Sequence, residues 1–169
     1  MVWAGLLFFS ALSCAGNDGE KDCWAGSRAR VVWLQDHGDG RDVLARGNRL
    51  KLMGWDSADR RGERTILPDI GPYRKPLISP GGDRIVFSLP DPDRVMVVHW
   101  NGKNLRSVAE GVAVDLWRDP ATGHEWVYVA RDPRPTDSVN ERFGQIVRIR
   151  LDSPGETEQV WDQTVVGRV

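Results

Sequence analysis

Short runs of apolar residues alternate with turn-forming segments along most of this chain, and the same order of segments recurs. In the clearest copy, a Ser-Pro-Gly-Gly turn at 79–82 is followed by apolar runs at 84–88, 95–100 and 105–108. The runs are rich in β-branched and aromatic residues and are bounded by Gly, Pro, Asn or Asp, which is typical of strands joined by hairpins. No segment keeps the 3.6-residue period of an amphipathic helix. The pattern therefore predicts an all-β chain.

Two further copies of this pattern flank the clearest one. Their strands are predicted at 28–35, 49–53 and 62–67, and at 112–117, 125–130, 145–151 and 157–161, with a Pro-rich loop at 131–140. Matching aromatic positions repeat after 41 residues, from Phe87 to Tyr128, and after 45 residues, from Trp55 to Trp100. Four-stranded repeats of about 40–45 residues are typical of β-propeller blades, which bury their faces only by stacking. We therefore expect about three four-stranded antiparallel blades.

The number of copies predicts an incomplete ring. A ring of four to six blades needs roughly 160–270 residues, whereas this chain has 169 and its first residues do not fit the repeat. Residues 25–169 are expected to form a partial propeller, and 164–169 resemble the start of a fourth copy. The sequence thus has the features of an N-terminal fragment.

The start of the chain resembles a targeting segment. Residues 1–13 are an apolar run of signal-peptide length, too short to span a bilayer, although no Lys or Arg precedes the run. Residues 14–24 form a polar tether. Cys14 resembles the lipidated cysteine of a bacterial lipobox, although the leucine of that motif lies three places before the cysteine and Leu12 lies two places before Cys14. An oxidising compartment would also permit a Cys14–Cys23 disulfide. Export to the periplasm or outer surface is expected, with lipidation, a disulfide or two free thiols left open.

The charge balance excludes one class of partner. The chain has 23 Lys and Arg against 24 Asp and Glu, for a net charge of -1. A nucleic-acid-binding domain would carry an excess of basic residues, so we expect no nucleic acid partner. We expect contact with a membrane only through a lipid anchor at Cys14. The eight Trp residues lie mostly at predicted strand positions, where large rings fill the space between stacked sheets.

Residues 75–88, Lys-Pro-Leu-Ile-Ser-Pro-Gly-Gly-Asp-Arg-Ile-Val-Phe-Ser, resemble the blade repeat of the TolB-like propellers. In that family a Pro, a Ser-Pro-Asp-Gly turn and an Ile-Ala-Phe-like strand recur in each blade. Gly82-Asp83 here replaces Asp-Gly, and 97–102 resembles the third strand and its turn, whereas the turn at 118–123 departs from the motif. The resemblance implies an interaction scaffold of the bacterial envelope. Similar blades also occur in peptidases and polysaccharide lyases, so the fold alone does not decide between an interaction scaffold and part of an enzyme.

Few residues suggest catalysis or metal binding. His37, His99 and His124 occupy different places in their copies, which argues against a shared metal site. A loop with Asp at every third position, Asp36, Asp39 and Asp42, lacks the closing Glu of an EF-hand and is better explained as a solvated hairpin loop. The sequence contains no Gly-x-Ser-x-Gly elbow and no phosphate-binding glycine motif. We expect no catalytic residue, no metal and no cofactor.

The binding candidates lie near the end of a predicted innermost strand. They are Asp115, Trp117, Arg118 and Asp119. Innermost strands line a propeller's channel, where ligands reach polar side chains, although Asp115 also suits a bond to a neighbouring blade and Arg118 and Asp119 suit turn capping. The expected function is an exported module that binds an envelope protein or a glycan and has no catalysis of its own. The alternative is that these blades belong to a larger enzyme, either a polysaccharide lyase or a serine hydrolase.

Overall fold

The computed structural model describes residues 29–42, 44–59, 61–134, 141–162 and 165–167. The predicted leader at 1–13, the tether at 14–24 and both cysteines lie outside the described residues, so export, lipidation of Cys14 and a Cys14–Cys23 disulfide stay predictions. Within the described ranges, no helix is long and apolar enough to cross a membrane.

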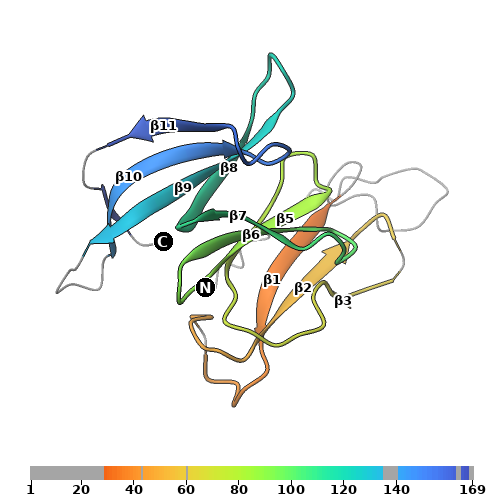
Figure 1. Ribbon diagram of the computed structural model, residues 1–169. Helices are drawn as coiled ribbons and strands as arrows, with labels where there is room; N and C mark the ends of the chain where they lie inside the picture. The colour runs from red at the N-terminus through yellow and green to blue at the C-terminus, as the bar shows by residue number, and fades with distance from the viewer. Residues whose placement is uncertain (1–28, 43, 60, 135–140, 163–164, 168–169) are drawn as a thin grey trace, which may run out of the picture.

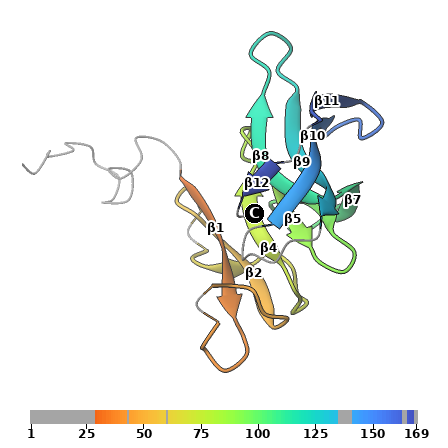
Figure 2. The same cartoon turned by 90° about the vertical axis from the view of Figure 1, so that its left-hand side faces the viewer.

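The described strands form three antiparallel sheets, and the second sheet lies between the other two (Figures 1 and 2). The first sheet has the order β1 (Arg30–Asp36), β2 (Leu50–Asp56), β3 (Arg64–Thr65). The second has the order β4 (Arg74–Ile78), β5 (Arg84–Leu89), β6 (Arg94–His99), β7 (Arg106–Glu110). The third has the order β8 (Val112–Arg118), β9 (Glu125–Arg134), β10 (Glu141–Arg150), β11 (Thr157–Trp161), and β12 (Val165–Gly167) also pairs with β10. The predicted all-β class with blade-like sheets is confirmed.

The core lies between the sheets because the second sheet is apolar on both faces. In β5, Ile85 and Phe87 point toward the first sheet and pack with Leu52, whereas Val86 points toward the third sheet and packs with Val127. A strand buried on both faces has a continuous apolar run in place of strict alternation. Side chains of one sheet therefore complete the core of the next, as the blade model predicted.

The repeat register differs by one residue from the one the sequence suggested. The backbone N–H of Ser79 donates to the carbonyl of Arg84, and the equivalent bond in the third sheet joins Asp119 to His124. Counting from these hairpins, Phe87 corresponds to Val127 and not to Tyr128. The pairing of Phe87 with Tyr128 in the sequence was wrong by one position, which moves Tyr128 to the opposite face of its sheet.

Two segments differ from their predicted structures. The segment at 131–140 was expected to be a loop, but β9 continues to Arg134 and includes Pro133, which lies opposite Phe143 near the strand's end. A proline at a strand end removes only one donor from the ladder. The segment at 164–169 was expected to begin another copy, whereas β12 pairs with Glu141–Phe143 and thus extends the third sheet.

Candidate functional site

A cavity of about 690 Å³ opens where the chain passes from the second sheet to the third. Its lining comes from the β5–β6 connection, the end of β7, the end of β9 and β10, with the residues Pro92, Asp93, Glu110, Gly111, Arg131, Asp132 and Gln145. The volume falls within the range of about 300–1,000 Å³ that is usual for small-molecule sites. The sequence did not predict this cavity.

The backbone around the cavity adopts unusual conformations. Gly111 has φ +114°, its N–H donates to the carbonyl of Asp93 at 2.9 Å, and a Cβ built on it would lie 2.3 Å from the carbonyl oxygen of Ala130. Asp91 and Asp132 have φ of +51° and +59°. Such conformations cost non-glycine residues about 1–3 kcal/mol each and gather at functional sites. Only glycine fits the position between β7 and β8.

The cavity lining offers both hydrogen-bond donors and acceptors. It contains the carboxylates of Asp93, Glu110 and Asp132, the guanidinium of Arg131 and the carboxamide of Gln145. The Nε of Arg131 donates to the carbonyl of Glu110 at 3.2 Å, which holds the guanidinium across the junction between the sheets. Groups of these kinds can bind hydroxyls and amides from several sides.

Arg118 and Asp119, two of the four predicted binding residues, hold the β8–β9 turn. The Nε of Arg118 donates to the carbonyl of Gly123 at 3.2 Å. Asp119 accepts from the hydroxyl of Thr122 at 2.8 Å and from the N–H of Ala121 at 2.9 Å, and these bonds lower the pKa of its carboxyl, the Thr122 bond most. Both residues lie at the opposite end of β8 from Gly111, so the structure does not bring them to the cavity.

Asp115 and Trp117, the other two candidates, share the face of β8 that points away from the second sheet. Asp115 lies opposite Tyr128 and Trp117 lies opposite Trp126. The guanidinium of Arg148 lies 5.3 Å from the ring centre of Trp117 and 4.7 Å from that of Trp126, within the range of cation–π contacts. Their role in ligand binding stays a prediction.

The charge of Asp115 also acts on the neighbouring sheet. Burial lowers the pKa of Lys75 on β4, and the charge of Asp115 partly opposes that shift. Strands β4 and β8 contact each other, and both are edge strands of their sheets. Asp115 therefore interacts across the boundary between the second and third sheets.

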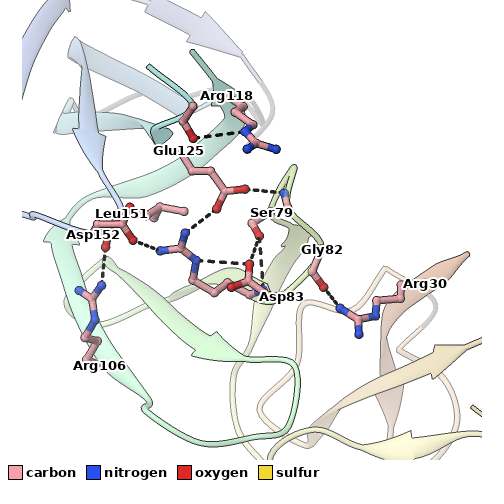
Figure 3. Close-up of polar contacts among 12 residues, drawn as sticks. Arg30, Ser79, Gly82, Asp83, Arg106, Arg118, Glu125, Leu151 and Asp152 are labelled. Carbon is pink, nitrogen blue, oxygen red and sulfur yellow. Dashed lines mark hydrogen bonds and ion pairs between the residues drawn. The ribbon is translucent and has the colours of Figure 1, made fainter. Parts of the chain in front are cut away.

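Ion pairs join the second and third sheets at the end that carries the β4–β5 turn (Figure 3). Arg84 donates to Glu125 and to Asp152, each at 2.6 Å. Glu125 is 4% exposed, and its other oxygen accepts from the N–H of Gly81. Burial alone would lower the pKa of Arg84, but the bond to Asp152 and the charges of Asp152, Glu125 and Asp83 raise it. This network links the second and third sheets, and Arg84 balances the charge of the buried Glu125.

Different contacts join the first and second sheets. Arg30 of the first sheet donates to the carbonyl of Gly82 in the β4–β5 turn of the second sheet, both labelled in Figure 3. Within its own sheet, Arg30 also donates to the carboxylate of Asp56 at 2.8 Å. The guanidinium of Arg30 also lies 4.7 Å from the ring centre of Trp100, and that of Arg64 lies 5.6 Å from it. Arginine–tryptophan stacking therefore joins the first and second sheets, whereas a buried ion pair joins the second and third.

In the parts of the chain that the structure describes, no group of three or more His, Cys, Asp or Glu side chains could hold a metal ion. Asp36 accepts from the N–H of Gly38 at 2.6 Å and of Asp42 at 3.3 Å, and Asp42 in turn accepts from the N–H of Gly47. These carboxylates fold their own loop, as the hairpin-loop interpretation predicted.

The bonds at Asp36 lead to a pH prediction. The N–H groups of Gly38 and Asp42 lower the pKa of the Asp36 carboxyl from its usual 3.8. A carboxyl whose pKa is depressed by folding stabilises the folded state above its unfolded pKa, and this contribution is lost as the pH falls through the folded pKa. We expect the side-chain carboxyl resonance of Asp36, assigned by its loss in Asp36→Asn, to titrate below pH 3.8. A midpoint at or above that value would contradict the loop geometry.

Comparisons with known proteins give a likeness to solved structures. No protein-family model matches the sequence, and no curated protein matches it. Among solved structures, the chain is similar to an oligogalacturonate lyase in complex with manganese, at 16% sequence identity and a TM-score of 0.45. The match covers 69% of this chain and 31% of the lyase chain, so this chain spans about a third of the length of that protein. No activity, metal or substrate is transferred from a likeness at this level.

Proposed function

We propose that this chain works as an interaction module of a TolB-like propeller in the bacterial envelope, and that its ligand binds in the cavity between the second and third sheets. The observation that carries this proposal is the cavity itself, whose volume suits a small ligand or a side-chain cluster. Its lining comes from the β5–β6 connection, the β7–β8 junction and residues of β9 and β10. Export and a lipid anchor at Cys14 complete the proposal.

The chemistry of the lining favours a ligand that is rich in hydroxyl or amide groups. Asp93 and Glu110 accept hydrogen bonds, Arg131 donates them, and Gln145 can do both. Among the described residues that line the cavity none is aromatic, so we expect hydrogen bonds from the polar lining to contribute to affinity. Among the expected partners, a glycan satisfies this pattern best, and an extended polar peptide is the second choice.

A glycan array tests the proposal. We expect the full chain to bind a subset of bacterial cell-wall oligosaccharides, and the variant Gln145→Ala to bind them about fivefold to tenfold more weakly, because one hydrogen bond is worth about 1–1.5 kcal/mol. The matched control is Asp119→Ala, which alters the distant turn and should leave binding unchanged.

The outcomes separate the competing sites and functions. Loss of binding in Asp119→Ala but not in Gln145→Ala would place the ligand at the β8–β9 turn and contradict the cavity. Cleavage of a bound oligosaccharide, detected by mass spectrometry of the array compounds after incubation, would favour the alternative that these sheets belong to an enzyme. Binding to no oligosaccharide would contradict the choice of a glycan.

A further inference from the structure

Lys75 lies in an irregular part of β4, the first strand of the second sheet. The register of β4 with β5 shifts between Arg74 and Leu77, so β4 contains one more residue there than its partner strand. A bulge of this kind bends a strand and re-aims the side chain at the extra position. Lys75 has φ +46°, a left-handed conformation that lysine rarely adopts. The backbone therefore gives the Lys75 side chain a direction that a regular strand would not give it.

The strand that carries Lys75 lies where the three sheets approach one another. β4 is an edge strand of the second sheet, and it contacts the edge strands β1 of the first sheet and β8 of the third, all labelled in Figure 2. Edge strands that converge in this way line the central channel of a propeller. The described lining of the cavity between the second and third sheets does not include Lys75. Lys75 therefore marks a second place on the molecule, on the channel side of the sheets.

Most charged groups on the strands packed against β4 have partners of their own. These groups are Arg30 and Asp36 on β1, Arg84 on β5, and Asp115 and Arg118 on β8, with Arg74 on β4 itself. Arg30 and Arg84 are paired with carboxylates. Asp36 and Arg118 bond to the backbone of adjoining turns. Asp115, which is exposed on β8, is the group among them whose charge acts on Lys75.

The amine of Lys75 is more easily deprotonated than that of a lysine in water. Burial lowers its pKa, and the charge of Asp115 opposes only part of that shift. In the described parts of the chain, no hydrogen bond or ion pair holds the ammonium of this half-buried residue. Desolvation disfavours the charged form of an amine, and the neutral form is the nucleophile. At neutral pH, a larger share of Lys75 is therefore in the reactive form.

We propose that Lys75 is a covalent binding site for small aldehydes, which it holds as an imine in the channel. The neutral amine adds to the carbonyl carbon, a proton moves from nitrogen to oxygen, and loss of water leaves a carbon–nitrogen double bond. The step consumes no oxidant or reductant, and addition of water reverses it. Acyl transfer to the same amine would need an activated donor, whereas an aldehyde needs only the neutral amine. The open-chain form of a reducing sugar belongs to this class of ligand.

Reductive trapping tests the proposal. The full chain is incubated at neutral pH with glycolaldehyde and sodium cyanoborohydride, and its proteolytic peptides are followed over time by mass spectrometry. Lys103, exposed in the β6–β7 connection, is the internal reference. We expect Lys75 to be modified at least about threefold faster than Lys103, because each unit by which a pKa falls raises the neutral fraction about tenfold and half-burial slows access. Equal or slower modification of Lys75 would overturn the proposal.

The variant Asp115→Asn tests the environment assigned to Lys75. Loss of this carboxylate leaves the effect of burial unopposed and lowers the pKa of the amine further, so we expect Lys75 to react at least about twofold faster than in the unaltered chain. The matched control is Glu63→Gln, which removes an exposed carboxylate beside β3, at the edge of the first sheet away from β4. Its rate at Lys75 should be unchanged.

Two outcomes of the comparison contradict the site. If Asp115→Asn does not accelerate the reaction at Lys75, or if Glu63→Gln accelerates it equally, the channel environment described for this amine is wrong. The rate at Lys103 in the same digests shows that the trapping conditions are the same for each variant. Far-UV circular dichroism shows that the sheets of both variants are intact.

Discussion

Replacing Arg84 with alanine should lower the free energy of unfolding by about 3–5 kcal/mol, among the largest losses for any single charged side chain in the chain. Glu125 is 4% exposed, and Arg84 supplies its opposite charge at 2.6 Å. Without Arg84, the carboxylate of Glu125 stays in the interior, and among the described residues the N–H of Gly81 is the hydrogen-bond partner that remains. Urea unfolding followed by tryptophan fluorescence measures the loss.

An exposed ion pair on the third sheet provides the control for Arg84. Glu158, whose side chain is 51% exposed, is paired with Arg148 at 2.6 Å. Exposed pairs contribute about 0–1 kcal/mol, so Glu158→Ala should have a small effect. The double variant Arg84→Ala/Glu125→Ala should lose less than the sum of the single variants, because it removes the unpaired charge. Equal losses for Arg84→Ala and Glu158→Ala would show that Glu125 is not buried as described.

Replacing Phe87 with alanine should cost about 3–5 kcal/mol, because it empties a fully buried aromatic site. Phe87 packs against Tyr73 with ring centres 5.4 Å apart, in the cluster between the first and second sheets. Tyr128, its partner in the sequence repeat, is half-buried on the outward face of the third sheet. The change Tyr128→Ala should therefore cost only about 1 kcal/mol.

The comparison of Phe87 with Tyr128 also tests the register. Similar losses of unfolding free energy at the two positions would support the register that the sequence suggested, in which Phe87 corresponds to Tyr128. A small loss at Phe87 alone would contradict the core between the first two sheets.

Strand positions could be predicted from the sequence, but the orientation of one strand could not. The Ser-Pro-Gly-Gly turn at 79–82 and the apolar runs after it fixed the second sheet well, because both turn chemistry and β-propensity point to the same boundaries. In the third copy, Trp126, Val127, Tyr128 and Val129 are all large and apolar. Polar and apolar residues do not alternate here, so the sequence does not show whether Val127 and Val129 or Trp126 and Tyr128 face the second sheet. The pairing of β9 with β8 decides between them.

The candidate site was less accessible to sequence reasoning. Asp115 and Trp117 lie on a strand, as the sequence predicted, and their part in binding stays a prediction, whereas Arg118 and Asp119 satisfy their own turn. The cavity was missed because its lining comes from strands and connections that are far apart in the sequence. One signal was available: Gly111 stands between two apolar runs where a strand would not place a glycine.

The unlike junctions between the sheets restrict how a chain of this kind can lengthen by gene duplication. In the register set by the hairpins, Glu125 of the third sheet corresponds to Ile85 of the second. A tandem duplicate of the second sheet would set the guanidinium of Arg84 against an isoleucine and leave a buried cation without its anion. The sheets are thus not interchangeable modules, and their order along the gene is specified by the charges at their boundaries.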